Sequence, residues 1–235
     1  MVKPTPNAAV PTEKCTNKRG AQLENRCQRF VEAAESLFLA RGFAGTSVNE
    51  IVRVAGGSLT TLYATFGTKD ELFVAVMNRR AATLFTDIVN AKSPAADTAT
   101  ELLGLAKRMQ NYMLSENALA IYRLAIHEGP KFPSVRNAVL LNGLNEFLQR
   151  LEEYFTGLKT TQKLEIDDAA LAAEHFLTLI QGQLRTRAAC GDADNVTKKQ
   201  RDDHAKKAVD AFLRIYPAKL PPKRSPKNRS APSIA

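Results

Sequence analysis

Apolar residues recur along the chain at the three- and four-residue spacing that places them on one face of a helix. The first two such sets are Phe30, Ala34, Leu37 and Phe38, then Val48, Ile51, Val52 and Ala55. No alternating run of Val, Ile and Thr bounded by turn residues interrupts this pattern. We therefore predict an all-α fold.

Turn and capping residues divide the first part of this pattern into short helices. Gly42 in "RGF" ends the first helix in a left-handed cap. Thr46 or Ser47 begins the second helix, and Glu50 completes a capping box with Ser47. A glycine pair then forces a turn, and Ser58 caps a third helix that closes at Gly67.

A second capping box, Thr68 with Glu71, opens a longer fourth helix. Four short helices within some fifty residues, with a tight glycine turn between the second and third, predict a helix-turn-helix domain. Further helices are expected near 97–114, 117–128, 134–156, 167–189 and 198–215, separated by segments rich in turn formers. The predicted layout is a basic N-terminal arm (1–22), a helix-turn-helix domain (23–78), a larger helical domain (79–216) and a disordered basic tail (217–235).

The predicted third helix lies in the stretch "SLTTLYATF", which contains no Lys, Arg, Asn or Gln. On a helical wheel Leu59, Leu62, Tyr63 and Phe66 fall within one arc of about 100°, and the opposite arc holds Thr60, Thr61, Ala64 and Thr65. Exposed threonines are poor helix formers, so stability alone does not explain this face. Small polar side chains permit close approach to a DNA groove.

The net charge of +9 is concentrated at the two ends of the chain. Residues 1–29 carry six basic and two acidic side chains, and the tail from Pro217 carries five basic and no acidic ones. Flexible basic ends favour contact with a polyanion, although such a tail can equally serve solubility.

Other functions find less support in the sequence. Cys15, Cys27 and Cys190 are odd in number and lack metal-ligand spacing, so we interpret them as reduced thiols. Neither a cofactor nor a metal is expected. No apolar run is long enough to span a membrane, and the polar N-terminus lacks a secretory signal, so we expect a cytoplasmic protein. An all-helical enzyme is the alternative, but no nucleophile-base set or phosphate loop is visible.

The segment from Arg26 to Met77 resembles the DNA-binding domain of the TetR family of bacterial transcriptional regulators. The matching motifs are "RGF", "TSVNEI" and above all "TLYATFGTKDELF". The resemblance implies DNA contacts by Thr61 and Tyr63 and a phosphate contact by Lys69 at a helix N-terminus. The candidate DNA-binding residues are Ser47, Ser58, Leu59, Thr60, Thr61, Tyr63, Thr65 and Lys69, with Lys14, Lys18, Arg19 and Arg26 in or beside the arm.

Two departures from the family pattern alter these expectations. Gly57 stands where the family usually has an inward-packing Val, which predicts a looser turn. Leu59 stands where Lys, Gln or Arg is frequent; the helical wheel buries Leu59, whereas the resemblance places it near DNA. We follow the resemblance, because residues at a helix end project past the packed core.

The second half contains "AIYRLAIHEGPKFPSV", which is similar to the C-terminal domain of a TetR subgroup that includes regulators of efflux pumps. This resemblance implies an effector pocket and a dimer interface built from the last two long helices. Pocket candidates are Phe85, Met109, Tyr112, Met113, Tyr122, His127 and Phe132. Interface candidates are Leu171, Phe176, Leu179, Ile180, Leu184 and Phe212.

These expectations describe a dimeric repressor that binds a palindromic operator. A small hydrophobic or aromatic effector would release it, and its target would be an efflux or related operon. In this hypothesis the predicted third helix fits the DNA groove through hydroxyl and apolar contacts, and the basic N-terminal arm supplies the positive charge that attracts the DNA.

Deletion of residues 1–20 tests this division of labour. The deletion should flatten the dependence of operator affinity on salt, because each lost phosphate contact lowers the logarithmic slope by about 0.9. Fluorescence anisotropy of labelled operator DNA at several salt concentrations measures the slope. An unchanged slope would show that the arm does not neutralise phosphates.

Overall fold

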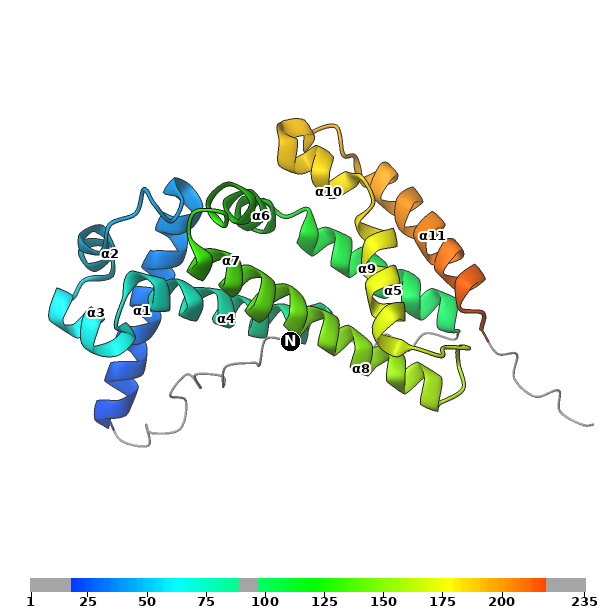
Figure 1. Cartoon of the computed structure of the whole chain (residues 1–235), viewed down its shortest axis with the longest axis horizontal. Helices are drawn as coiled ribbons and strands as arrows, with labels where there is room; N and C mark the ends of the chain where they lie inside the picture. Colours follow the sequence, from blue (N-terminus) through cyan, green and yellow to red (C-terminus); the bar gives the residue numbers. More distant parts are fainter. Residues whose placement is uncertain (1–17, 89–96, 219–235) are drawn as a thin grey trace, which may run out of the picture.

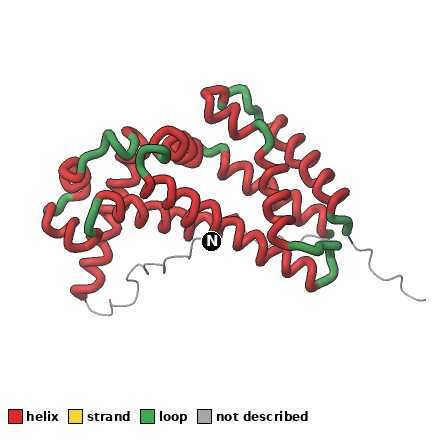
Figure 2. The backbone as a smooth tube through the Cα atoms, in the orientation of Figure 1, coloured by secondary structure: helices red, strands yellow, loops and turns green. Residues whose placement is uncertain are grey.

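The structure is a computed structural model that describes residues 18–88 and 97–218, with the backbone alone described for 18–23 and 81–88. The described chain is helical, joined by short loops (Figure 2). One isolated antiparallel bridge joins Leu164 to Ala218. The all-α prediction is confirmed.

The elements follow one another along the chain as a series of packed helices (Figure 1). In order they are α1 (Lys18–Arg41), α2 (Val48–Ala55), α3 (Leu59–Phe66), α4 (Lys69–Ile88), α5 (Thr98–Met113), α6 (Glu116–Glu128), α7 (Pro133–Val139), the π-helical η1 (Leu140–Asn145), α8 (Glu146–Thr160), α9 (Ala169–Gln181), α10 (Leu184–Arg187), η2 (Ala188–Asp192) and α11 (Lys198–Ile215). Figure 1 shows α1, α2 and α3 at one end and α5, α9 and α11 at the other. The tail prediction lies outside the described residues from 219 onward.

The predicted capping signals form as expected. Gly42 follows α1 with φ +76°. The Ser47 hydroxyl oxygen accepts from the backbone N–H of Glu50, and the backbone N–H of Ser47 donates to the Glu50 carboxylate. The Thr68 N–H donates to Glu71 at 2.8 Å in the second box. These caps satisfy the backbone donors that a helix N-terminus leaves without partners.

Two helical spans differ from the prediction. The span expected at 134–156 runs from Pro133 to Thr160 and contains the π-helical turn η1. The span expected at 167–189 breaks at Gly182, which has φ +46°. A Cβ at residue 182 would lie 2.5 Å from the His204 ring, so this break depends on α11 as well as on backbone preference.

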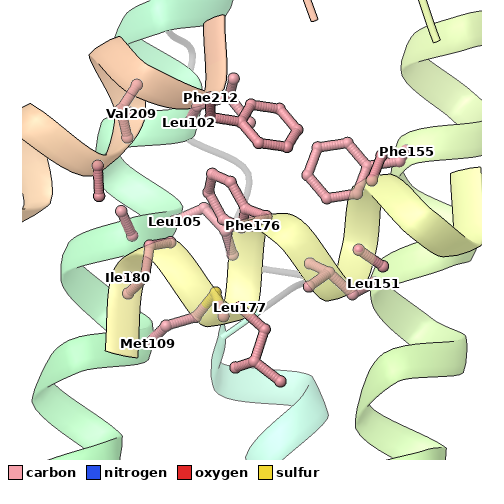
Figure 3. Close-up of a cluster of buried hydrophobic side chains, with 14 of the residues drawn as sticks. Leu102, Leu105, Met109, Leu151, Phe155, Phe176, Leu177, Ile180, Val209 and Phe212 are labelled. Carbon is pink, nitrogen blue, oxygen red and sulfur yellow. The ribbon is translucent and has the colours of Figure 1, made fainter. Parts of the chain in front are cut away.

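Two main apolar cores hold the helices together. The first joins α1–α4 to α6 and α7, and it includes Phe38, Phe73, Leu124 and Val135. The second joins α5, α8, α9 and α11 around a cluster of aromatic rings (Figure 3). Because α4 is continuous across the predicted boundary at residue 78 and the first core includes α6 and α7, the helix-turn-helix half packs directly against the second half.

The turn at Gly57 is tightly packed, contrary to the expectation of a looser turn. An ideal Cβ at this position would lie 2.7 Å from Cζ of Phe30, whose side chain is fully buried. The Phe30 ring therefore occupies the space that an inward Val would need. Phe30 also meets Phe66 edge to face, at 6.4 Å between ring centroids.

Replacing Gly57 by Val should reduce the free energy of unfolding by about 1–3 kcal/mol, because the new side chain overlaps the Phe30 ring. Chemical denaturation measures the loss. Gly157→Val in α8 is the matched control, since no atom lies within 4 Å of a Cβ built there. Equal stability of Gly57→Val and wild type would contradict the tight turn.

Candidate nucleic-acid interface

A helix-turn-helix unit forms the end of the molecule where α2 and α3 lie (Figure 1). Ser47 caps α2, which ends at Gly56 with φ +68°. Ser58 has extended backbone and caps α3. On the inner side of α3, Leu62 is fully buried in the first core, and Phe66 packs beside it.

The outer side of α3 presents an exposed surface that we call the α3 face. It comprises Leu59, Thr60, Tyr63, Ala64 and Thr65. Leu59 is 39% exposed and Tyr63 49% exposed. Leu59 and Tyr63 are thus exposed although the helical wheel places them in the same arc as the buried Leu62.

Hydrogen bonds within the helix engage some of the hydroxyl groups at this face. Ser58 Oγ accepts from the Thr61 N–H at 3.1 Å and lies 2.9 Å from the Thr61 hydroxyl. Thr65 donates its hydroxyl to the Thr61 carbonyl at 2.8 Å. Thr61 is half-buried, whereas Thr60 and Tyr63 are exposed. Thr60 and Tyr63 therefore offer the hydroxyls best placed to meet a partner.

Lys69, the predicted phosphate ligand, is half-buried at the start of α4. Its ammonium lies 4.3 Å from the centroid of the Phe43 ring. Burial lowers the pKa of Lys69, while the nearby charges of Glu128 and Asp70 oppose that shift. Part of the positive field of Lys69 is thus balanced by carboxylates of the protein itself.

Glu128 at the end of α6 joins the two halves, a role that sequence analysis missed. It is 6% exposed, and its carboxylate accepts from the Ala44 N–H at 2.8 Å. Phe132 meets Phe43 beside it, at 5.2 Å between ring centroids. A carboxylate at a helix C-terminus is repelled by the partial negative charge of the helix dipole. This position in the sequence could have indicated that Glu128 needs stabilising partners from another part of the chain.

We call this set of contacts the α6 junction: Phe43, Ala44 and Lys69 on one side and Glu128 and Phe132 on the other. Ser134 of α7 adds a hydrogen bond to Asp70 of α4. The junction connects the loop after α1 and the start of α4 directly to the end of α6.

The basic arm is described only in part. Lys14 lies outside the described residues, and for Lys18 and Arg19 only the helical backbone of α1 is described. Arg26 is exposed on α1. Where the remaining arm charges lie relative to the α3 face stays a prediction.

The candidate effector residues occupy several different environments. Met109 and Met113 are buried in the second core, with Tyr112 packed against it (Figure 3). Tyr122 faces Arg185, His127 is exposed, and Phe132 belongs to the α6 junction. The side chain of Phe85 lies outside the described residues. The structure thus brings the α5 candidates together and places His127 and Phe132 apart from them.

The candidate dimer residues divide between core and surface. Phe176, Ile180 and Phe212 are fully buried within the protomer. Leu179 packs partly against the same core, and Leu184 lies in a small third cluster. Leu171 is 45% exposed. The buried residues hold α9 and α11 in place, and their outer faces remain available for a second copy.

Two other kinds of site are absent from the described residues. No group of three or more His, Cys, Asp or Glu side chains there could hold a metal ion. None of the helices in the described ranges is both long and apolar enough to cross a bilayer.

The fold and the α3 face define a helix-turn-helix DNA-binding regulator. Residues 30–76 match the family model of bacterial regulatory proteins of the tetR family. Residues 100–218 match the C-terminal domain of AefR-like transcriptional repressors. The chain belongs to the TetR family of transcriptional regulators.

Curated relatives match over part of their length. The HTH-type transcriptional repressor BdcR of Escherichia coli is 32% identical over 99 residues, covering 39% of this chain and 50% of the relative. The HTH-type transcriptional activator FasR of Mycolicibacterium smegmatis is 34% identical over 89 residues, covering 37% and 40%. The chain therefore spans half or less of the length of these relatives.

Solved structures match over most of both chains. A TetR-family regulator from Mesorhizobium loti superposes with a TM-score of 0.76 at 26% identity, covering 83% of this chain and 98% of that one. The flavonoid-responsive regulator FrrA superposes with a TM-score of 0.70 at 26% identity, covering 82% and 97%. The similarity to solved structures includes the C-terminal half as well as the helix-turn-helix.

Proposed function

We propose that the protein is a ligand-responsive repressor that binds a palindromic operator as a homodimer. The observation that carries this proposal is the α3 face, where Thr60 and Tyr63 project from a helix held by the buried Leu62. Small outward side chains let the helix backbone approach the floor of a major groove closely. Two such helices related by a twofold axis would meet two half-sites of a palindrome.

Sequence specificity would come from a limited set of contacts. The α3 sequence "LTTLYATF" carries no Arg, Lys, Asn or Gln for bidentate recognition of guanine or adenine. Leu59 and the threonine methyl groups suit thymine methyls, and the hydroxyls suit base edges or phosphates. DNA shape would supply further discrimination, and the charges of Arg26 and the arm would supply affinity.

Dimerisation would use the outer faces of α9 and α11. These helices would pair with their copies as a four-helix bundle, with the exposed Leu171 in the contact. Phe176 and Phe212 support the interface from within by fixing both helices on the second core.

Repression is the direction we favour because the AefR-like repressor domain spans residues 100–218. BdcR is named a repressor and FasR an activator, so the direction rests chiefly on that domain. The effector we propose is hydrophobic or aromatic, in line with the flavonoid-responsive regulator FrrA, and the regulated target is an efflux or related operon. Such a regulator works in the cytoplasm, where the chromosome lies.

Release by effector would pass through the α6 junction. Movement of α6 displaces Glu128, whose carboxylate holds Ala44 beside the start of α2, and shifts the surroundings of Lys69. A small change at α6 then alters the spacing of the two recognition helices.

A gel shift with the promoter DNA next to the gene tests the proposed function. Wild type should give a specific shift that excess unrelated DNA does not remove. Tyr63→Ala should weaken it about tenfold or more, because it removes a contact from the α3 face. Ile126→Ala, which removes an exposed side chain from α6, is the matched control and should leave affinity unchanged. Equal loss in both variants, or no specific wild-type shift, would refute the proposal.

A further inference from the structure

Three arginines lie where α10 and η2 pack on α6, and two of them have protein partners. Arg123 of α6 donates to the carbonyls of Ala188 and Ala189, at 2.9 Å and 2.6 Å. Arg187 pairs with Asp192, at 2.6 Å between Nη2 and Oδ2. The third, Arg185 of α10, forms no ion pair within the described part of the chain. This difference marks Arg185 for a separate role.

The Arg185 side chain is half-buried and stacked on an aromatic ring. Its Cζ lies 4.0 Å from the centroid of the Tyr122 ring. Its Nε is buried and has no hydrogen-bond acceptor among the described residues. Burial lowers the pKa of the guanidinium, although Tyr122 and Tyr112 oppose that shift. A buried donor on a cation without an acceptor is costly, which favours an acceptor supplied from outside the protein.

Two phenol groups accompany the guanidinium. Tyr112 comes from α5 and Tyr122 from α6, and both are half-buried. The Tyr122 ring stacks on the Arg185 guanidinium, and Tyr112 also acts on the pKa of Arg185, so groups from three helices influence this side chain. Guanidinium and phenol groups can all donate hydrogen bonds, and Tyr112 packs against the apolar second core.

We propose that Arg185, with Tyr112 and Tyr122, binds the carboxylate of an aromatic effector. This inference rests on the proposed ligand response and narrows its effector to an organic anion. The planar guanidinium can donate two parallel hydrogen bonds to the two oxygens of a carboxylate, and the attraction between these charges is stronger at a site shielded from water. The aromatic body of the ligand lies against the tyrosine rings.

The site connects to the rest of the mechanism through α6. Tyr122 and Glu128 stand six residues apart on this helix, or about 9 Å along its axis. Anion binding beside Tyr122 therefore acts on the same rigid element that holds the α6 junction.

Isothermal titration with cinnamate and its neutral amide, cinnamamide, tests this site. Wild type should bind cinnamate at least tenfold more tightly than cinnamamide, as expected for a charge-assisted contact. Arg185→Met should bind the two probes alike, with cinnamate weakened at least tenfold, and Arg185→Lys should retain part of the preference. Absence of cinnamate binding, equal wild-type affinity for both probes, or an unchanged preference in Arg185→Met overturns the proposal.

A second pair of variants covers the case in which Arg185→Met fails to fold. Tyr112→Phe and Tyr122→Phe keep the rings and lose the hydroxyls, so each should weaken cinnamate severalfold and leave cinnamamide unchanged. Unchanged cinnamate binding in both would exclude the phenols from the site. The operator gel shift is measured separately, without either probe. Absence of a specific wild-type shift refutes the proposed function, whereas a specific shift together with equal affinity for cinnamate and cinnamamide refutes only the anion site.

Discussion

A carboxylate from the C-terminal half holds the backbone of the DNA-binding half. Glu128 is almost fully buried, and a buried carboxylate is stable only when its oxygens meet donors or positive charge. Ala44 supplies a backbone N–H at 2.8 Å, and Lys69 supplies positive charge. Because Lys69 also rests on Phe43, which packs on Phe132, these contacts fix the helix-turn-helix against α6 and α7.

The placement of this junction gives α6 a central position. One end of the helix carries the junction, and Tyr122 within the same helix lies under Arg185. Two sites on one short helix share its movement, since a helix resists bending more than the loops that flank it. In the proposed mechanism, α6 alone therefore connects anion binding to operator release.

Local features could be predicted from the sequence, and long-range contacts could not. The capping boxes at Ser47 and Thr68 depend on residues three apart, so they can be predicted directly from the sequence. The fit of Gly57 against Phe30 depends on a distance between separate helices, which led to the wrong expectation of a looser turn. That Arg185 forms no ion pair among the described residues likewise becomes visible only in the structure, where Arg123 and Arg187 do have oxygen partners.

Hydrogen exchange at residues 42–46 tests the central claim, that Glu128 holds the DNA-binding half in place. In Glu128→Ala, exchange at these amides should accelerate about tenfold or more, because the loop loses a hydrogen bond to a charged group. His127→Ala, an exposed neighbour on the same helix, should leave exchange unchanged. Equal exchange in Glu128→Ala and wild type would contradict the account.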